Sequence, residues 1–303
     1  MQSILILGTG ALATLFAARL SSSGVDVSML GTWQAGLEAL QKDGARLALA
    51  DGSELIGRVR ATDDRSACRG AKLALVLVKA WQTERAASQL RQCLADDGLA
   101  VSLQNGLGNR ETLARFLGMP RAGLGVTALG ATLLGPGRAG YGGDGPVSLE
   151  SGHPGLGALE RMLNGAGFRV ELVPDARALM WGKLVVNSAI NPLTALLRVP
   201  NGVLLERPGA RDLMIALARE TAAVAQALGV ALPFDDAAAA VEAVARRTAS
   251  NRSSMLQDVQ RGACTEIDAI CGAVVRAGER AAVPVPLNRA VWQLVESLVS
   301  DPR

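Results

Sequence analysis

The sequence predicts an α/β fold in which a parallel sheet occupies the first half of the chain and helices alone make up the second half. Short apolar runs typical of buried parallel strands, such as Ile4–Leu7 and Leu73–Val78, alternate with helical periods up to Pro174. Beyond Pro174 the strand pattern stops and Ala- and Leu-rich helical periods follow. The length of 303 residues and the apolar content of 49% suffice for two domains with a core each. We therefore expect one domain over residues 1–174 and a second, all-helical domain over residues 175–303.

The first strand–helix–strand unit carries a dinucleotide-binding pattern. Ile4–Leu7 is followed by Gly8-Thr9-Gly10-Ala11-Leu12-Ala13, a helical pattern, and a second strand over Val25–Leu30. In this G-x-G-x-x-A pattern Gly8 permits the tight turn, Gly10 lets the backbone approach a pyrophosphate, and Ala13 allows close packing of helix on strand. Small residues also serve packing alone, but a position directly after a strand and at the start of a helix is the context that the motif requires. We interpret this domain as Rossmann-type.

The end of the second strand indicates which dinucleotide binds. NAD sites usually place Asp or Glu there to hold the ribose 2′-hydroxyl, and NADP sites place an Arg nearby. Here the chain reads Leu30-Gly31-Thr32-Trp33-Gln34, with neither residue type. Thr32 and Gln34 could hydrogen-bond a 2′-phosphate. NADP(H) is therefore favoured as cofactor, with NADH as the alternative.

Two further buried strands end in polar residues. Leu73–Val78 leads into Lys79, and Leu99–Leu103 leads into Gln104 and Asn105. Ligands of open α/β sheets bind beyond the carboxyl ends of the strands, so Lys79 and Asn105 are expected where a nicotinamide nucleotide and its substrate would lie. The alternative interpretation of Lys79 is a solvated loop lysine, and that of Asn105 is a simple turn residue.

The remaining elements follow from local pattern. The Gly-rich segment from Gly123 to Leu149 is interpreted as antiparallel strands that extend the sheet, followed by a helix over 156–164 and a last strand over 168–173. Helical periods in the second domain cover 176–197, 210–228, 235–249, 264–279 and 287–298, and a loop at 251–254 leads into a further helix, with Ser253 or Ser254 as its cap and Gln257 completing a capping box.

A polar face runs along the helix predicted over 176–197. Lys183, Asn187 and Asn191 recur at a spacing of four, which places them on one side. A solvated face with a snorkelling lysine is one interpretation. However, such a face would normally carry several flexible charges, and Asn is a poor helix former at interior positions. Two amides in register therefore indicate hydrogen bonding to a specific ligand.

Composition excludes several classes of function. The formal net charge is only +3, aromatic residues make up 3% of the chain, and there is no basic run, so we expect no nucleic-acid partner. No apolar run reaches the roughly 20 residues of a membrane span, and no signal peptide is recognisable, so we expect no membrane partner and a cytoplasmic location. The four cysteines form no C-x-x-C motif, and the single histidine, His153, lies in a Gly/Pro-rich turn. We expect no metal site and no histidine-based triad.

Several motifs in order along the chain carry a family resemblance. They are GTGALA at 8–13, LVKAWQ at 77–82, LQNGLG at 103–108, WGKLVVNSAINP at 181–192, SSMLQD at 253–258 and TEID at 265–268. Together these motifs resemble the ketopantoate reductase (2-dehydropantoate 2-reductase) family over essentially the whole chain.

The resemblance implies NADPH-dependent reduction of 2-dehydropantoate to pantoate, a step toward pantothenate and coenzyme A, in a cleft between the two domains. It implies that Lys183 is the catalytic proton donor and that Glu266, also catalytic, contacts the cofactor ribose and supports the geometry of the site. The residues that it assigns to substrate binding are Asn105, Lys183, Asn187, Asn191, Asn201 and Ser254. With the fingerprint, the residues assigned to the cofactor are Gly8, Thr9, Gly10, Ala11, Leu12, Ala13, Thr32, Lys79, Asn105, Ala131 and Glu266.

One departure from the family pattern concerns the cofactor. Family members often carry a basic residue just after the second strand, and Gly31–Gln34 has none. We therefore expect a reduced preference for NADPH.

Two alternatives to the main interpretation are the same chemistry on another small 2-oxoacid and a redox sensor without turnover. Lys183 together with Glu266 argues against the sensor, which needs no proton donor. A homodimer is compatible with the sequence.

Overall fold

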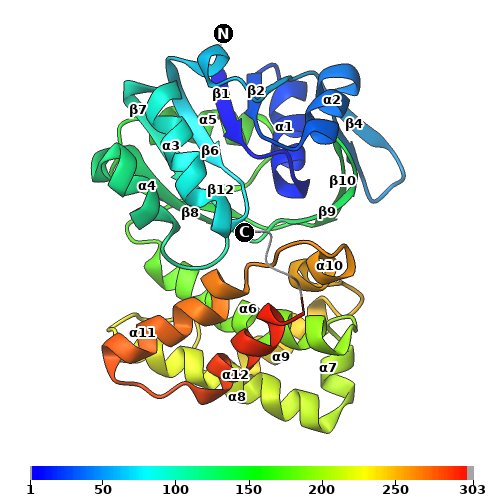
Figure 1. The fold of residues 1–303 in the computed structure, drawn as a ribbon, viewed down its shortest axis with the longest axis vertical. Coiled ribbons are helices and arrows are strands. Elements are labelled where there is room, and N and C mark those ends of the chain that lie inside the picture. The colour runs from blue at the N-terminus through cyan, green and yellow to red at the C-terminus, as the bar shows by residue number, and fades with distance from the viewer. Residues whose placement is uncertain (1, 299–303) are drawn as a thin grey trace. The chain divides into compact units, whose positions relative to one another are not determined.

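The computed structural model describes residues 2–298 (Figure 1), and the chain divides into two compact units. Unit 1 comprises Met1–Gln104 and Asn109–Ala176, and unit 2 comprises Asn105–Gly108 and Arg177–Arg303. The short segment Asn105–Gly108 therefore packs with unit 2, although its neighbours in the chain belong to unit 1. The fold class predicted from the sequence is confirmed: unit 1 contains a mainly parallel sheet with helices, and unit 2 is helical.

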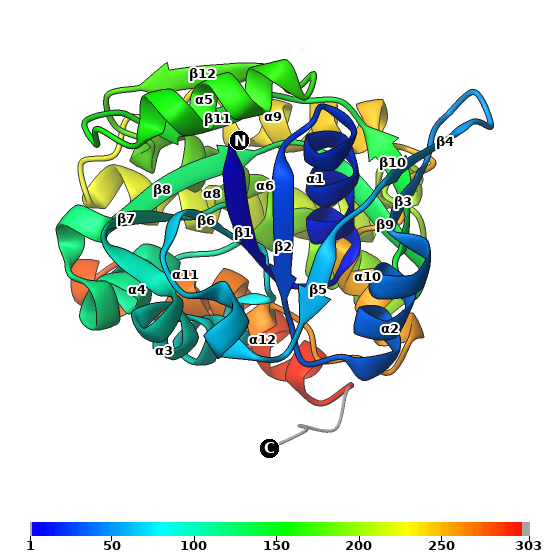
Figure 2. The same ribbon diagram turned by 90° about the horizontal axis from the view of Figure 1, so that it is seen from above.

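Among residues 2–298, the main sheet of unit 1 has eight strands in the order β12-β11-β8-β7-β6-β1-β2-β5, which can be followed in Figure 2. These strands are β1 (Ser3–Leu7), β2 (Asp26–Leu30), β5 (Arg60–Thr62), β6 (Ala71–Val76), β7 (Leu94–Ser102), β8 (Ala122–Thr127), β11 (Val147–Glu150) and β12 (Val170–Val173). Neighbours from β5 to β8 are parallel, whereas β11 is antiparallel to β8. The strand order reverses beside β1, and such a switch point is where open α/β sheets bind their ligands.

Both faces of this sheet are buried at its central strands. The helices of unit 1 are α1 (Ala11–Ser22), α2 (Gln34–Asp43), α3 (Thr83–Cys93), α4 (Asn109–Leu117) and α5 (Leu156–Gly165), with short helical turns η1 (Arg65–Cys68), η2 (Ala80–Gln82) and η3 (Met119–Arg121). In β1, Ile4 and Ile6 join the core formed with α1 and α5, and Leu5 and Leu7 join the core formed with α3 and α4. The alternation of side chains between two buried faces explains why the strand reads as an unbroken apolar run.

The prediction for the Gly-rich segment 123–149 is wrong in its middle part. β8 and β11 do belong to the main sheet, but β9 (Gly130–Gly135) and β10 (Arg138–Gly143) do not extend it. In the described part of the chain they form a second, four-stranded sheet with β3 (Ala45–Ala48) and β4 (Glu54–Gly57), in the order β4-β3-β10-β9. The partner strands come from a segment about 90 residues earlier, so local pattern could not reveal the pairing.

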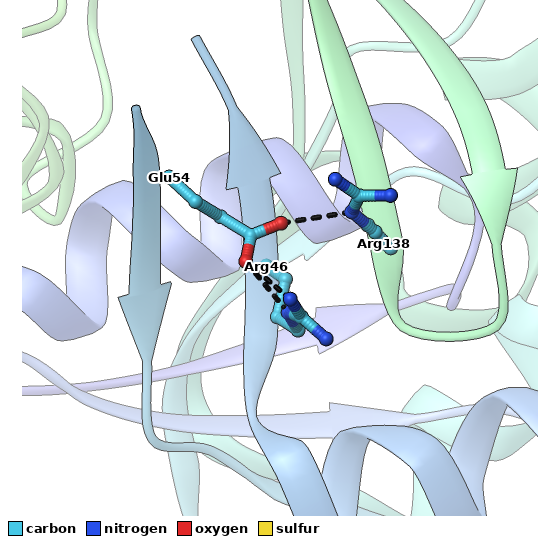
Figure 3. A network of polar contacts seen from close by, with 3 residues as sticks. All are labelled: Arg46, Glu54 and Arg138. Atoms are coloured by element: carbon cyan, nitrogen blue, oxygen red, sulfur yellow. Dashed lines mark hydrogen bonds and ion pairs between the residues drawn. The ribbon is translucent and has the colours of Figure 1, made fainter. Parts of the chain in front are cut away.

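An ion-pair network joins three strands of the second sheet (Figure 3). Glu54 on β4 accepts hydrogen bonds from Nε of Arg46 on β3, at 2.9 Å, and from Nε of Arg138 on β10, at 2.8 Å. The hydrogen bond from Arg46, and then that from Arg138, hold the pKa of Glu54 below its ordinary value. The network therefore links the segment of residues 45–57 to β10 by charge as well as by strand pairing.

Unit 2 is built around one long helix, α6 (Arg177–Leu197), which packs against α8, α9, α10 and α12. Its other elements are α7 (Val203–Glu206), α8 (Pro208–Ala227), α9 (Ala237–Arg247), α10 (Ser254–Gln260), the π-helix η4 (Asp268–Gly272), α11 (Ala273–Ala281) and α12 (Pro286–Glu296). Over residues 2–298, no helix has the length and apolar character that crossing a membrane requires.

Helix α6 continues through Pro192, as the sequence pattern predicts. Proline has no N–H, so the carbonyl of Ser188 loses its normal helical donor. The thiol of Cys271 donates to that carbonyl instead, with Sγ 3.7 Å from the oxygen. Burial raises the pKa of Cys271, so the thiol stays protonated and able to donate. A contact with the segment that ends in α11 thus compensates for the missing hydrogen bond.

The helix predicted over 264–279 is wrong in its first part. Cys264–Glu266 is not helical, and the helical segment begins at Ile267, runs as the π-helix η4 from Asp268, and continues in α11 to Ala281. π-helical turns are rare and occur frequently at functional sites. Glu266 lies directly before this irregular turn.

Candidate functional site

Gly8 directly follows β1 and contacts the residues at the carboxyl ends of β2 and β6. Its φ of +124° is a conformation that side chains disfavour, and a Cβ there would lie 3.0 Å from the carbonyl oxygen of Leu77, just after β6. Its N–H donates to the carbonyl of Leu30 at the end of β2, at 2.9 Å. Glycine is therefore required at residue 8 by the fold itself, in the tight turn that the motif predicts.

Gly10 is different, because the protein does not require glycine there. Its φ of −82° and ψ of −173° suit any residue, and a Cβ would meet no heavy atom of the described residues within 4 Å. Gly10 is exposed and caps α1, where its carbonyl accepts the N–H of Thr14 at 2.9 Å. Open space at a helix N-terminus, kept clear by a glycine that packing does not need, fits the pyrophosphate of a dinucleotide. The rest of the fingerprint, from Thr9 to Ala13, lies in the same turn and first helical residues.

The loop after β2 contains Thr32, which is exposed. Its neighbour Gly31 has no room for a side chain, because a Cβ there would lie 2.7 Å from Cγ2 of Thr9. Gln34 donates through Nε2 to Oδ2 of Asp63, at 2.9 Å. Asp63 follows β5, a strand that the sequence pattern did not reveal, so sequence reasoning missed this acidic residue beside the end of β2.

Lys79 and Ala131 both belong to unit 1 but lie on different parts of it. Lys79 is half-buried in the loop between β6 and η2, three residues after β6 ends at Val76, and its carbonyl accepts the N–H of Gln82 at 2.8 Å. Gln104 donates to the carbonyl of Val78 at 2.9 Å and so ties this loop to the end of β7. Ala131 lies on β9 of the second sheet and not on an extension of the main sheet, although it packs against the same core as α1.

In unit 2, α6 presents its polar face largely out of solvent. Lys183 and Asn187 are half-buried, and Asn191 is only 7% exposed. Burial lowers the pKa of Lys183 to about 8, while the negative charge of Glu266 acts in the opposite direction. The ammonium group is thus protonated at neutral pH and close to the point of releasing its proton. This face is not the solvated helix surface of the alternative interpretation.

Glu266 is fixed by the segment Asn105–Gly108. Nδ2 of Asn105 donates to Oε2 of Glu266 at 3.1 Å, and the N–H of Leu107 donates to the carbonyl of Ala269 at the same distance. Gly106 has a φ of +82°, and a Cβ there would lie 2.2 Å from the carbonyl oxygen of Ala269. Only glycine allows the segment to dock this closely. The structure therefore brings Asn105, Glu266 and the charge of Lys183 together, although 161 residues separate the first two in the chain.

Asn201 is 8% exposed, and only one of the two polar atoms of its side-chain amide has a hydrogen-bond partner among the described residues. Its Nδ2 donates to Oγ1 of Thr248 at 2.9 Å, whereas its Oδ1 is buried without a partner among the described residues. A buried acceptor without a donor is costly, so this oxygen is suited to a ligand hydroxyl or N–H.

Ser254 opens α10 but does not cap it. Ser253 is the cap: its Oγ accepts the N–H of Leu256 at 3.0 Å and lies 2.7 Å from Oγ1 of Thr194 on α6. The predicted capping box is wrong, because Gln257 donates through Nε2 to the carbonyl of Arg252 instead. Capping by Ser253 leaves the exposed side chain of Ser254 outside the cap.

Within residues 2–298 there is no group of three or more His, Cys, Asp or Glu side chains that could hold a metal ion. The side chain of His153 stabilises the turn in which it lies, because its Nδ1 accepts a hydrogen bond from the N–H of Gly155 at 2.9 Å.

A Rossmann-type sheet with a dinucleotide fingerprint, followed in the chain by a helical unit with a half-buried lysine influenced by the charge of a glutamate, defines a nicotinamide-dinucleotide oxidoreductase. Residues 4–153 match the family model described as Ketopantoate reductase PanE/ApbA, and residues 175–299 match the model of its C-terminal part. The chain therefore belongs to the ketopantoate reductase family.

Relatives of similar length support the same assignment. The 2-dehydropantoate 2-reductase of Archaeoglobus fulgidus is 38% identical over 306 residues, covering 99% of both chains. That of Halobacterium salinarum is 32% identical, covering 98% of this chain and 99% of the relative. Among solved structures, a PanE/ApbA family ketopantoate reductase from Ralstonia eutropha JMP134 matches with a TM-score of 0.91 and 33% identity, covering 98% of each chain. A D-mandelate dehydrogenase with NADH and anilino(oxo)acetate matches with a TM-score of 0.90 and 25% identity, also covering 98% of each chain.

Proposed function

We propose that this protein reduces the keto group of 2-dehydropantoate to give pantoate, with NADPH as the hydride source and NADH as an alternative. The observation that carries the proposal is the half-buried Lys183, with its pKa lowered to about 8, on the same helix face as Asn187 and Asn191. Full-length relatives named 2-dehydropantoate 2-reductase support the choice of substrate.

Lys183 is the proposed proton donor. When bound, the reduced nicotinamide supplies the hydride to the carbonyl carbon. Negative charge then develops on the carbonyl oxygen, where the ammonium of Lys183 stabilises it and transfers a proton to it. A pKa of about 8 keeps the amine charged at neutral pH and makes it a stronger acid than an ordinary lysine.

Glu266 is proposed to keep this donor charged. Its negative charge raises the pKa of Lys183 against the effect of burial. Asn105 fixes the carboxylate through its 3.1 Å hydrogen bond and is itself proposed to touch both the cofactor and the substrate. Glu266 is further proposed to contact the cofactor ribose. Together the two side chains couple the position of the segment Asn105–Gly108 to the acidity of the lysine.

The substrate is proposed to be held by uncharged groups. Asn187, Asn191 and Asn201 offer amides, with Oδ1 of Asn201 buried and unpartnered among residues 2–298. Ser254, exposed at the start of α10, is proposed to bind the substrate carboxylate. Amides and a hydroxyl orient a small oxoacid without a charge that competes with the ammonium of Lys183.

The cofactor is proposed to bind unit 1 through the fingerprint Gly8–Ala13, with Thr32, Lys79 and Ala131 contributing. Support comes from the open space at Gly10, at the N-terminus of α1, which is twelve residues long. We propose the functional division of the chain as residues 1–174 for the cofactor and 175–303 for substrate and catalysis.

A second candidate is reduction of a different 2-oxoacid, which the structural similarity to a D-mandelate dehydrogenase favours. The discriminating experiment follows the oxidation of NADPH and of NADH with a panel of acids: 2-dehydropantoate, phenylglyoxylate, 2-oxoisovalerate and pyruvate. We expect the highest kcat/KM with 2-dehydropantoate. A higher value with phenylglyoxylate would favour the mandelate-type activity. Binding of a dinucleotide without turnover of any acid would favour a sensor and overturn the proposed enzyme.

A further inference from the structure

The strand β5 places an acidic residue beside the end of β2. The two strands are parallel, with Leu30 paired to Thr62, and the N–H of Gly31 donates to the carbonyl of Thr62 at 3.1 Å. The next residue of each strand is therefore Gly31 on one side and Asp63 on the other. Asp63 lies at the carboxyl edge of the sheet, where dinucleotides bind.

The acidic side chain is held toward the loop after β2. Oδ2 of Asp63 accepts a hydrogen bond from Nε2 of Gln34, at 2.9 Å, and both residues are exposed. Gln34 is thus occupied by an acid rather than offered to a phosphate. A carboxylate has about four acceptor positions, so Asp63 can accept a ligand hydroxyl besides Gln34.

Gly31, the first residue after β2, cannot be replaced by an acidic residue without displacing Thr9. A Cβ at Gly31 would lie 2.7 Å from Cγ2 of Thr9, so the side chain of Thr9 occupies the place where a side chain at residue 31 would begin. In dinucleotide-binding folds an acid at this end accepts a hydrogen bond from the ribose 2′-hydroxyl of NAD, whereas an arginine accommodates the 2′-phosphate of NADP. Here the neighbouring strand carries the acid.

We propose that Asp63, oriented by Gln34, is a specificity-determining residue that accepts the ribose 2′-hydroxyl of NADH and repels the 2′-phosphate of NADPH. The inference rests on the dinucleotide site of the proposed function. It gives a physical reason for the reduced preference for NADPH that the sequence predicts: one carboxylate charge would face a phosphate that carries about −1.5 to −2.

Other charges of the same loop act differently. Asp64 is turned into its own backbone, because its Oδ1 accepts the N–H of Ser66 at 2.8 Å and its Oδ2 accepts the Ser66 hydroxyl at 2.6 Å. These hydrogen bonds, with smaller contributions from the charges of Arg65 and Arg69, hold the pKa of Asp64 below its ordinary value. Asp64 is therefore a matched control for Asp63, and Arg65 is the nearby cation that could instead attract a phosphate.

The test measures binding to the full chain by titration calorimetry with NADPH, NADH, adenosine 2′,5′-bisphosphate and AMP. For Asp63→Asn we expect the ratio Kd(NADH)/Kd(NADPH) to rise roughly fivefold or more, because a charge near the phosphate is removed at a partly screened surface. The bisphosphate should gain affinity and AMP should not. Asp64→Asn should change the ratio less than twofold, because the Asp64 carboxylate is bonded to Ser66 of its own loop and its charge is screened at the surface.

An unchanged ratio in Asp63→Asn, or an equal rise in Asp64→Asn, would overturn the proposal. So would a loss of bisphosphate affinity in Arg65→Gln together with no response in Asp63→Asn, because Arg65 would then select the phosphate. If the wild-type chain binds neither dinucleotide, the proposed function fails as well. Binding of both with an unaltered ratio refutes only the role of Asp63. Asp63 is exposed, and unchanged thermal unfolding of the variant verifies its fold.

Discussion

Replacing Lys183 with methionine removes the half-buried amine and keeps a flexible side chain that adapts to apolar surroundings. In the folded protein burial lowers the pKa of this lysine from 10.5 to about 8. The folded protein therefore binds the proton of Lys183 more weakly than the unfolded chain does. At about 1.4 kcal/mol per pKa unit, this difference lowers the free energy of unfolding by about 3 kcal/mol at any pH below about 8. We therefore expect Lys183→Met to be more stable than the wild type at pH 7, by up to about 3 kcal/mol.

The pH dependence of this stability difference has a definite sign. Between about pH 8 and 10.5 the unfolded wild type binds a proton that the folded state has lost, so its unfolding free energy rises with pH in that window. Lys183→Met lacks this term. The stability advantage of the variant should therefore be full below about pH 8 and should shrink as pH approaches 10.5. Denaturant unfolding at pH 7 and pH 10 measures both values.

Kinetics provide the second measurement. The wild type should lose kcat/KM for reduction as pH rises through about 8, because Lys183 then loses the proton that it donates. Lys183→Met should lower kcat by roughly 10² or more and show no such limb, with nearly unchanged affinity for NADPH. Lys72→Met is the control, because Lys72 is 76% exposed in an ion pair with Asp97 and should alter neither property.

Wild-type-like activity of Lys183→Met would refute the assigned proton donor. A variant that is less stable than the wild type at pH 7, by the same amount as at pH 10, would refute the desolvated amine on which the argument depends.

Three further changes test the other parts of the site. Glu266→Gln removes the charge that raises the pKa of Lys183, so the alkaline limb of kcat/KM should move below pH 8; a limb that stays in place or moves upward would contradict the coupling. Gly10→Val should abolish dinucleotide binding in calorimetry without lowering Tm, because its Cβ meets no described atom within 4 Å; retained affinity would remove the fingerprint from the cofactor site. Asn187→Ala and Asn191→Ala should each raise KM for the oxoacid by the loss of a hydrogen bond of about 1–2 kcal/mol, with smaller effects on kcat, whereas near-neutral kinetics in both would indicate a helix face without ligand contacts.

Several parts of the fold were predictable because they depend on short-range pattern. The turn at Gly8, the helix that follows it, and the helix 177–197 with Lys183 and Asn191 on one face each follow from residues within a few positions of one another. The predicted helix also passes Pro192 correctly. Sequence alone, however, could not name the Cys271 thiol that compensates for the missing N–H.

Parts of the candidate site were only partly predictable. Motif resemblance singled out Asn105 and Glu266 separately, and only the tertiary structure shows that one donates to the other. Asp63 escaped the sequence reasoning because the three-residue strand before it is too short for a recognisable alternation of side chains. The π-helix after Glu266 likewise has no local signal, since its residues suit an ordinary α-helix.

The sequence by itself therefore determined the dinucleotide fingerprint, the fold class and the polar face of α6, because turns and helical faces are set by neighbours along the chain. Only the tertiary structure decided that β9 and β10 leave the main sheet to pair with β3 and β4, that Glu266 meets Asn105, and that the pKa of Lys183 falls to about 8. Strand partners, desolvation and long-range charge depend on which distant segments fold against one another, and the periodicity of a single segment does not contain that information.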